Sequence, residues 1–142
     1  MSEQKIKTEE IPKIEDFPVE WQIIIRGTQS LTSKARDGAD ITIVKENDYF
    51  AFITKKTSLE VVYYKDTGML EVVWKRYKFV NDEREPVFIK TYKKKIEKDD
   101  AKRLMFAWFE KILYHVDYKS NNTIIFQDFY YLYKAYEEQK EL

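Results

Sequence analysis

The sequence contains no cysteine and only one histidine, His115, among its 142 residues. Without cysteine, disulfides, thiolate metal sites, iron–sulfur clusters and cysteine nucleophiles are excluded. A single histidine also excludes a metal site built from several histidines of one chain. The three glycines, Gly27, Gly38 and Gly68, stand alone, so glycine-rich phosphate-binding loops are absent too. We therefore expect no cofactor, no bound metal and no enzymatic activity.

Long apolar runs are missing as well. The longest, residues 104–109, is far shorter than the roughly 20 residues needed to cross a bilayer. The chain does not open with the charged and then apolar segment of a secretory signal. With 44% apolar and 16% aromatic residues, it can still bury a sizeable core. We expect an intracellular protein without membrane contact, made of one domain over residues 17–142.

Charge is balanced overall but unevenly distributed. Residues 1–20 carry three lysines and six acids, whereas residues 50–95 carry 11 basic and six acidic side chains. The positive block favours association with anions, although a solvated surface also accounts for such a block. Residues 1–16 show no sustained apolar period, so we predict a mobile acidic arm there. Such an arm could cover the basic region in the free protein.

The periodicity predicts an α+β fold. Residues 17–36 fit either a strand or a helix, and we favour a helix with Pro18 in its first turn and Gly38 after its end. Short β-branched and aromatic runs, separated by turn residues, then predict an antiparallel meander of about five strands covered on one face by helices. The expected strands are 41–45, 49–55, 59–65, 69–80 and 87–94. Two C-terminal helices follow, one from Asp99 and Asp100 to about residue 118 and one to about Lys140.

Pairing Lys65 with Met69 across the turn at residues 66–68 divides the sheet into two faces. Extending the count over the neighbouring turns gives a mostly aliphatic face, expected under the helices, that comprises Tyr49, Ala51, Val62, Tyr64, Leu70, Val72, Trp74, Val80, Val87 and Ile89. The opposite face is aromatic and interleaved with lysines, and comprises Phe50, Phe52, Val61, Tyr63, Val73, Lys75, Tyr77, Phe79, Phe88, Lys90 and Tyr92.

Aromatic rings beside cations suit single-stranded nucleic acid, because bases stack on rings while lysine and arginine neutralise phosphates. We therefore predict a protein that binds single-stranded DNA, or RNA, with little sequence preference. The predicted nucleic-acid-binding residues are Phe50, Phe52, Tyr63, Tyr77, Phe79, Phe88 and Tyr92 for stacking, and Lys75, Arg76, Lys90, Lys93, Lys94 and Lys95 for phosphates.

Three alternatives stay open. The aromatic face could be a second core layer, covered by residues 17–36 or by the last helix. It could instead, like the last helix, be the contact surface of a protein-interaction module, viral or archaeal. Asp66, Glu71 and Lys75 faintly follow the layout of metal-dependent nucleases, but the spacing between Glu71 and Lys75 is too long by two. His115 lies on an apolar helix face without a Ser-His-Asp motif, and we interpret it as structural.

The last helix carries a short seam with spacings of four, three and four at Ile125, Phe129, Leu132 and Tyr136. This spacing is compatible with a homodimer through that helix.

The predicted order of elements is an acidic arm, an aromatic antiparallel sheet and two final helices, with Trp74, Tyr77 and Phe79 on one long strand. This layout resembles the ThermoDBP-like single-stranded DNA-binding proteins of thermophilic archaea. The resemblance implies an aromatic cleft for bases, a basic rim for phosphates, pairing of protomers through C-terminal helices, and a cytoplasmic, nucleoid-associated protein. The 35% charged content agrees with an origin in a hot environment. The seam here is rich in tyrosine and is no leucine zipper.

Overall fold

The computed structural model describes residues 12–141, so most of the predicted acidic arm, residues 1–16, lies outside the described residues. The elements in chain order are η1 (Ile14–Asp16), α2 (Val19–Arg36), β1 (Thr42–Glu46), β2 (Tyr49–Ile53), β3 (Thr57–Tyr64), β4 (Met69–Val80), β5 (Glu83–Lys95), α3 (Lys98–Tyr118) and α4 (Asn122–Glu141). The five strands form one antiparallel sheet in sequential order. The predicted α+β fold is confirmed, and residues 19–36 are a helix.

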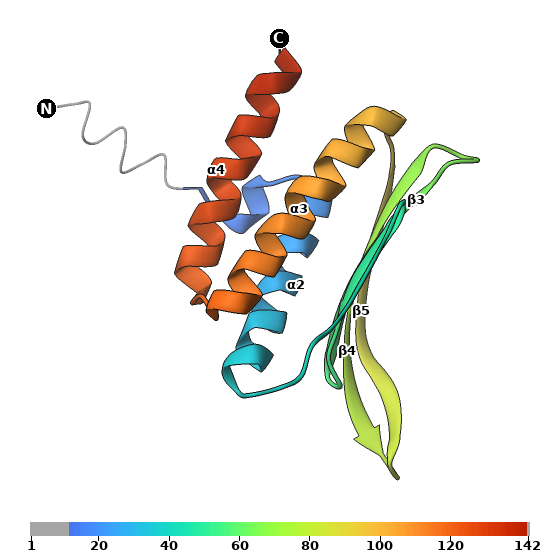
Figure 1. Ribbon diagram of the computed structural model, residues 1–142, viewed down its shortest axis with the longest axis vertical. Helices are drawn as coiled ribbons and strands as arrows, with labels where there is room; N and C mark the ends of the chain where they lie inside the picture. Colours follow the sequence, from blue (N-terminus) through green and yellow to red (C-terminus); the bar gives the residue numbers. More distant parts are fainter. Residues whose placement is uncertain (1–11, 142) are drawn as a thin grey trace, which may run out of the picture.

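The molecule has a sheet on one side and three helices on the other (Figure 1). Helix α2 packs on β3, β4 and β5, while α3 covers β2 through ring contacts of Phe109 with Phe50 and Phe52. Helix α4 lies behind α2 and α3 and is the helix farthest from the sheet (Figure 1). No helix within residues 12–141 packs on the second face of the sheet, and we call it the open face. None of the described helices combines the length and apolar character needed to cross a membrane.

The turn between β3 and β4 has four residues, one more than the sequence analysis assumed. Tyr64 pairs with Met69, and Val61 pairs with Val72. Gly68 adopts a positive φ of 72° at the end of this turn, which glycine does without steric cost. Because side chains alternate along a strand, the shift of one residue moves all of β4 to the opposite face relative to β3.

The turn between β4 and β5 is tighter than predicted. Asn81 and Asp82 both adopt positive φ angles, as in two-residue hairpins, so β5 begins at Glu83. The register shifts again between Arg76 and Tyr77: Arg76 pairs with Phe88, but Tyr77 pairs with Pro86, so Val87 is an extra residue on β5. The hairpin of β4 and β5 consequently extends beyond the other strands (Figure 1).

These registers correct the predicted faces. Phe50, Phe52 and Tyr63 were predicted to stack on bases, but they are at most 6% exposed and lie in the core beneath the helices. They share the covered face with Leu70, Val72 and Trp74, which pair with β3 and β5. The residues that were expected under the helices but belong to the open face are Tyr49, Ala51, Val62, Tyr64 and Ile89.

Gly27 brings α2 close to the sheet. A Cβ at this position would lie 2.7 Å from Cδ1 of Leu59 on β3, closer than real Cβ atoms approach. A larger residue would push the two elements apart. Gly27 therefore sets the spacing between α2 and the sheet.

The predicted seam of α4 is part of the protomer's own core. Ile125 and Phe129 are fully buried, and Leu132 and Tyr136 pack against the same cluster. The seam spacing reflects packing of α4 within one chain, so these four side chains do not form an exposed strip for a second copy.

Candidate functional site

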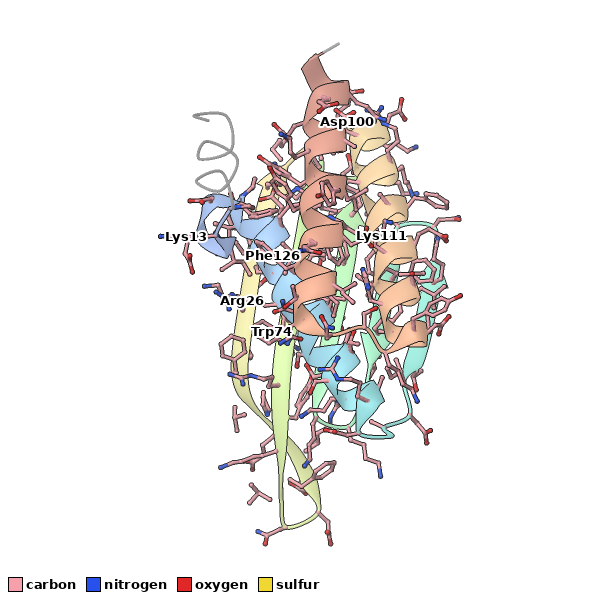
Figure 2. The ribbon with its side chains drawn as sticks, turned by 90° about the vertical axis from the view of Figure 1, so that its left-hand side faces the viewer. Lys13, Arg26, Trp74, Asp100, Lys111 and Phe126 are labelled. Atoms are coloured by element: carbon pink, nitrogen blue, oxygen red, sulfur yellow. The ribbon has the colours of Figure 1, made fainter. Side chains whose placement is uncertain are left out.

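A cleft of about 490 Å³ opens between α2 and the covered face of β4 and β5, where the sheet extends past the helix. Figure 2 shows Arg26 on α2 and Trp74 on β4 at this place. The side chains that line it, here called the aromatic cleft, are Gln22, Ile23, Arg26, Trp74, Arg76, Phe88 and Lys90.

Two aromatic rings form the floor of the aromatic cleft. The ring centroids of Trp74 and Phe88 lie 4.8 Å apart at an interplanar angle of 65°. Nε1 of Trp74 donates a hydrogen bond of 3.1 Å to Oγ1 of Thr57, which fixes the indole, and Trp74 is 9% exposed. The ring of Phe88 remains half-buried. The floor is therefore a fixed apolar corner with one accessible ring.

Three cations surround this corner. The guanidinium carbon of Arg76 lies 4.5 Å from the centroid of Phe88 and 5.5 Å from that of Trp74. Lys90 pairs with Trp74 in the register and lies on the same face. Arg26 approaches from α2, where its Nη2 lies 3.7 Å from a carboxylate oxygen of Glu15. Among the described residues that line the aromatic cleft there is no carboxylate; the lining therefore carries three positive charges, of which Arg26 is paired with Glu15 outside the lining.

The structure brings together only part of the predicted site. Arg76, Phe88 and Lys90 meet in the aromatic cleft. Tyr92 and Lys94 follow on the same face of β5, but Nζ of Lys94 donates a 2.8 Å hydrogen bond to the buried carboxylate of Glu20 and anchors α2. The predicted residues that lie on the open face, away from the aromatic cleft, are Lys75, Tyr77, Phe79, Lys93 and Lys95.

Four residues that line the aromatic cleft were not predicted from the sequence to belong to the site. Gln22, Ile23 and Arg26 belong to α2, and their spacing of three and four along a helix is visible in the sequence, but their orientation toward β5 is not. Trp74 was predicted to lie in the core, and its indole is indeed largely buried, with Nε1 hydrogen-bonded to Thr57.

On the open face, charged side chains contact one another. Glu71 accepts a hydrogen bond from the hydroxyl of Tyr64 and lies 4.0 Å from Nζ of Lys93. The hydrogen bond to this carboxylate raises the pKa of the Tyr64 hydroxyl. Lys95 donates to the backbone carbonyl of Thr67. The polar groups at this end of the open face are thus largely engaged within the protein.

The residues of the nuclease alternative do not converge. Glu71 and Lys75 are four residues apart on β4, about 13 Å along a strand. Within residues 12–141, no three histidine, aspartate or glutamate side chains are grouped so that they could hold a metal ion. Glu71 instead contacts Tyr64 and Lys93.

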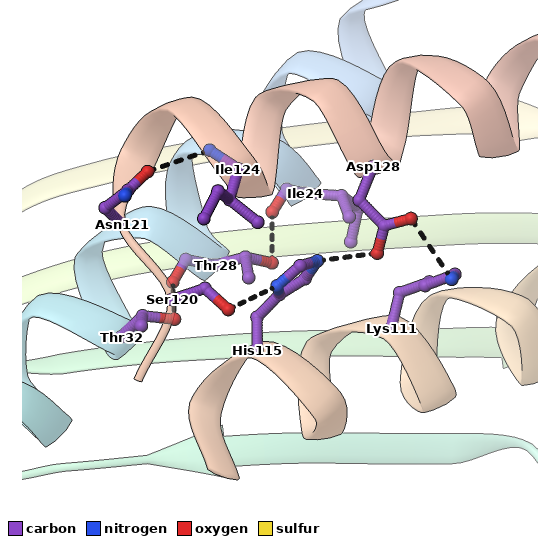
Figure 3. A network of polar contacts seen from close by, with 9 residues as sticks. All are labelled: Ile24, Thr28, Thr32, Lys111, His115, Ser120, Asn121, Ile124 and Asp128. Carbon is purple, nitrogen blue, oxygen red and sulfur yellow. Dashed lines mark hydrogen bonds and ion pairs between the residues drawn. The ribbon is translucent and has the colours of Figure 1, made fainter. Parts of the chain in front are cut away.

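His115 belongs to a chain of polar contacts between α3 and α4 (Figure 3). Its Nε2 lies 2.8 Å from Asp128, its Nδ1 lies 2.9 Å from the Ser120 hydroxyl, and Lys111 lies 3.2 Å from the other Asp128 oxygen. Since a carboxylate only accepts hydrogen bonds, Nε2 carries the proton, and the Ser120 hydroxyl donates to Nδ1 of the neutral ring.

The contacts run from Ser120 through His115 to Asp128, as in a hydrolase triad, but the imidazole is fully buried. Burial lowers the pKa of His115, against the opposing effect of Asp128. The Ser120 amide donates to the His115 carbonyl and closes the end of α3. These contacts support a structural role for His115, in which it joins the two helices.

No family model, curated protein or solved structure matches this chain. The aromatic cleft is therefore interpreted from its own chemistry: an apolar corner with a fixed indole, an accessible phenyl ring and three cations.

Proposed function

We propose that the protein binds single-stranded nucleic acid in the aromatic cleft, without strong sequence preference. The observation that carries this proposal is a pair of aromatic rings with Arg76 over both, in a cleft that Arg26 and Lys90 also line and whose described lining contains no acid. Such a site suits a ligand that is both aromatic and anionic, which describes a nucleotide chain.

The shape of the aromatic cleft favours single strands over duplexes. A base can stack on the Phe88 ring only when it is unstacked from its neighbours, because both faces of a base within a duplex are already covered. Phosphates on either side of that base would meet Arg26, Arg76 and Lys90. Stacking on a ring contributes about 1–3 kcal/mol per base and is tolerant of base identity.

Few lining groups could read a base edge. The amide nitrogen of Gln22 is already bound to the Phe17 carbonyl at 2.8 Å, so its free oxygen is the one amide acceptor among the lining side chains. Arginine and lysine supply charge and do not select a sequence when they contact phosphates. We expect affinity to depend on strandedness and salt far more than on sequence.

The test is fluorescence anisotropy of labelled single-stranded DNA, single-stranded RNA and matched duplex at two salt concentrations. Salt-sensitive binding to the single strands with weak binding to the duplex is the expected result, since bound phosphates release counterions. Equal binding to single strand and duplex would reduce the site to a general basic patch. Absence of binding to all three would overturn the proposal.

Two substitutions on opposite faces locate the site. Phe88→Ala removes the accessible ring of the aromatic cleft and should weaken binding of single strands about tenfold, within the range for one stacked base. Tyr77→Ala removes a ring of the open face and should change affinity less than about twofold. The reverse result would place binding on the open face. Thermal unfolding of both variants checks that Phe88→Ala remains folded.

A protein-interaction role is the second candidate function, and it rests on a different surface. A groove between α3 and α4 is bordered by exposed apolar side chains, with Tyr114 49% exposed, Ile124 48% and Tyr131 68%. Exposed rings of this kind are enriched in protein interfaces. Binding through this groove should respond little to salt, which distinguishes it from nucleic-acid binding in the aromatic cleft.

A further inference from the structure

A second hollow lies beside the aromatic cleft, at the end of α2. It has a volume of about 400 Å³ and is formed by the C-terminal turn of α2, the residues after it, and the turn between β2 and β3. We call it the turn hollow. Its charged lining residues are Lys34, Asp37, Asp40, Lys55 and Lys56.

The buried Thr57 is hydrogen-bonded to a lining residue of each hollow. Its Oγ1 accepts the hydrogen bond from Trp74 in the aromatic cleft, and its backbone carbonyl accepts hydrogen bonds from Thr54 in the turn hollow. It pairs with Arg76 across β3 and β4. Lys56 is held next to Arg76, because its carbonyl accepts the amide of Tyr77 at 2.9 Å. The two hollows are therefore adjacent.

Basic side chains continue from one hollow to the other along α2 as well. Arg26, Ser30 and Lys34 follow at intervals of four residues, and the Ser30 hydroxyl is 3.1 Å from Thr57 Oγ1. Eight helical residues span about 12 Å, so Arg26 and Lys34 mark the two ends of a short track. At the opposite end of α2, the acids Glu15 and Asp16 of η1 and Glu20 of the first turn replace the basic side chains.

The turn that carries Lys55 and Lys56 is held in a fixed conformation. Arg84 of β5 donates from Nε to the Lys55 carbonyl at 3.0 Å and from Nη2 to the Thr54 carbonyl at 2.7 Å. The carbonyls at the end of α2 are likewise occupied, by the amides of residues 37–39. The two lysine side chains are exposed and extend from a braced backbone.

We propose that a single strand bound in the aromatic cleft continues into the turn hollow, where Lys34, Lys55 and Lys56 contact its phosphates. This inference rests on the proposed function and adds a path and a direction of exit to it. Three lysines against Asp37 and Asp40 give the turn hollow one net positive charge, to which the neighbouring Arg76 adds. A phosphodiester chain is the ligand because its next phosphates must follow the base that the aromatic cleft holds.

The test compares oligothymidylates of about three and about twelve nucleotides, lengths that lie below and within the site sizes of single-strand binders. The double variant Lys55→Ala, Lys56→Ala keeps the two carbonyls that brace the turn. It should weaken binding of the longer oligonucleotide about tenfold, flatten its salt dependence by about two counterions, and leave the shorter one unchanged. Asp40→Asn should tighten binding of the longer one about twofold.

Lys93→Ala, Lys95→Ala is the matched control, since it removes the same charge from the open face and should change neither affinity by more than about twofold. Equal weakening of both lengths, or of neither, by the Lys55 and Lys56 variant would overturn the path while leaving the aromatic cleft as the site. Absence of binding of the unmodified protein to either length would overturn the proposed function itself. The titrations are made at about 0.15 M salt, where screening limits electrostatic interactions to about 8 Å, so that a charge removed from one face has little effect on the other.

Discussion

The aromatic cleft and the open face belong to the same sheet and contain the same residue types, yet they differ in what surrounds their cations. On the open face, Lys93 lies beside Glu71, and Lys95 is bound to a backbone carbonyl. In the aromatic cleft, Arg76 lies over two rings, and the described lining includes no acid. Rings lie beside cations on both faces, since Nζ of Lys93 is also 5.8 Å from the Tyr64 ring. The faces differ because a carboxylate partly neutralises Lys93, whereas Arg76 forms no ion pair with residues 12–141 and keeps its charge for a ligand. Of the described cations in the aromatic cleft, only Arg26 has a carboxylate partner, Glu15.

The comparison shows that composition alone does not identify a binding face. A strand with alternating lysines sends half of them to each side, and the partners on that side decide their role. Lys93 and Lys94 are neighbours in sequence, but one reaches Glu71 on the open face and the other reaches Glu20 beneath α2. These two lysines give the comparison its sharpest test.

The largest expected effect is on stability, from Lys94→Ala. Glu20 is 4% exposed and its carboxylate would lose its cation, which costs about 2–4 kcal/mol of unfolding free energy for a pair that is mostly but not fully buried. Lys93→Ala should cost less than about 1 kcal/mol, because Lys93 is exposed and its pair with Glu71 is 4.0 Å long. Urea unfolding measures both values.

A double variant checks the mechanism of this loss. Adding Glu20→Gln to Lys94→Ala removes the uncompensated charge and should recover about half of the stability. If Lys93→Ala and Lys94→Ala instead lowered the unfolding free energy equally, and Lys94→Ala also weakened DNA binding, Lys94 would be a phosphate-binding residue, as the sequence predicted.

The next prediction is that a fall in pH lowers the stability of the fold but leaves binding in the aromatic cleft unchanged. Burial lowers the pKa of His115 below its ordinary value of 6.5, so the folded protein keeps this ring neutral where the unfolded chain takes up a proton. Stability should therefore fall as pH falls from about 7 to 5.5, by at most about 1.4 kcal/mol per pH unit for this one proton. Affinity for single strands should stay constant there, because the described lining of the aromatic cleft contains no histidine.

His115→Gln provides the control, since glutamine can still donate to Asp128 but does not titrate. Its unfolding free energy should be lower at pH 7 and flatter down to pH 5.5, as measured by urea unfolding at each pH. Stability of the unmodified protein that rises on acidification would mean that the ring is charged in the fold, paired with Asp128 against the nearby Lys111.

Most of the fold follows from local sequence signals. Turn residues at 47–48, 66–68 and 81–82 mark the hairpins, and the spacing of apolar residues defines the helices, so the order and approximate bounds of the elements agree with the prediction. Asn81 and Asp82 could have indicated the tight hairpin, since these residue types tolerate positive φ.

The faces of the sheet could not be predicted, because they depend on the parity of each turn. One extra residue between Tyr64 and Met69, and one irregularity after Arg76, decide which side every residue of β4 and β5 occupies. The aromatic cleft also requires the docking of α2 across β4 and β5, which places Arg26 beside Trp74. Such a contact between segments about 50 residues apart leaves no local pattern in the sequence.

The smallest expected effect concerns the acidic residues that precede α2. Glu15 lies 3.7 Å from Arg26 with both side chains largely exposed, and pairs of this kind contribute about 0.2–1 kcal/mol. A bound phosphate would compete with this carboxylate for the guanidinium, so Glu15→Gln should tighten single-strand binding about two- to fourfold at low salt and by less at high salt. Glu46→Gln, which makes the same charge change at the end of β1, should leave the affinity measured by anisotropy unchanged.

Deletion of residues 1–16 should tighten binding more than Glu15→Gln does only if further acids of the arm also reach the aromatic cleft. Equal effects of the deletion and the single substitution would assign the competition to Glu15 alone, and no effect of either would remove the predicted autoinhibition while leaving the contrast between the two faces intact.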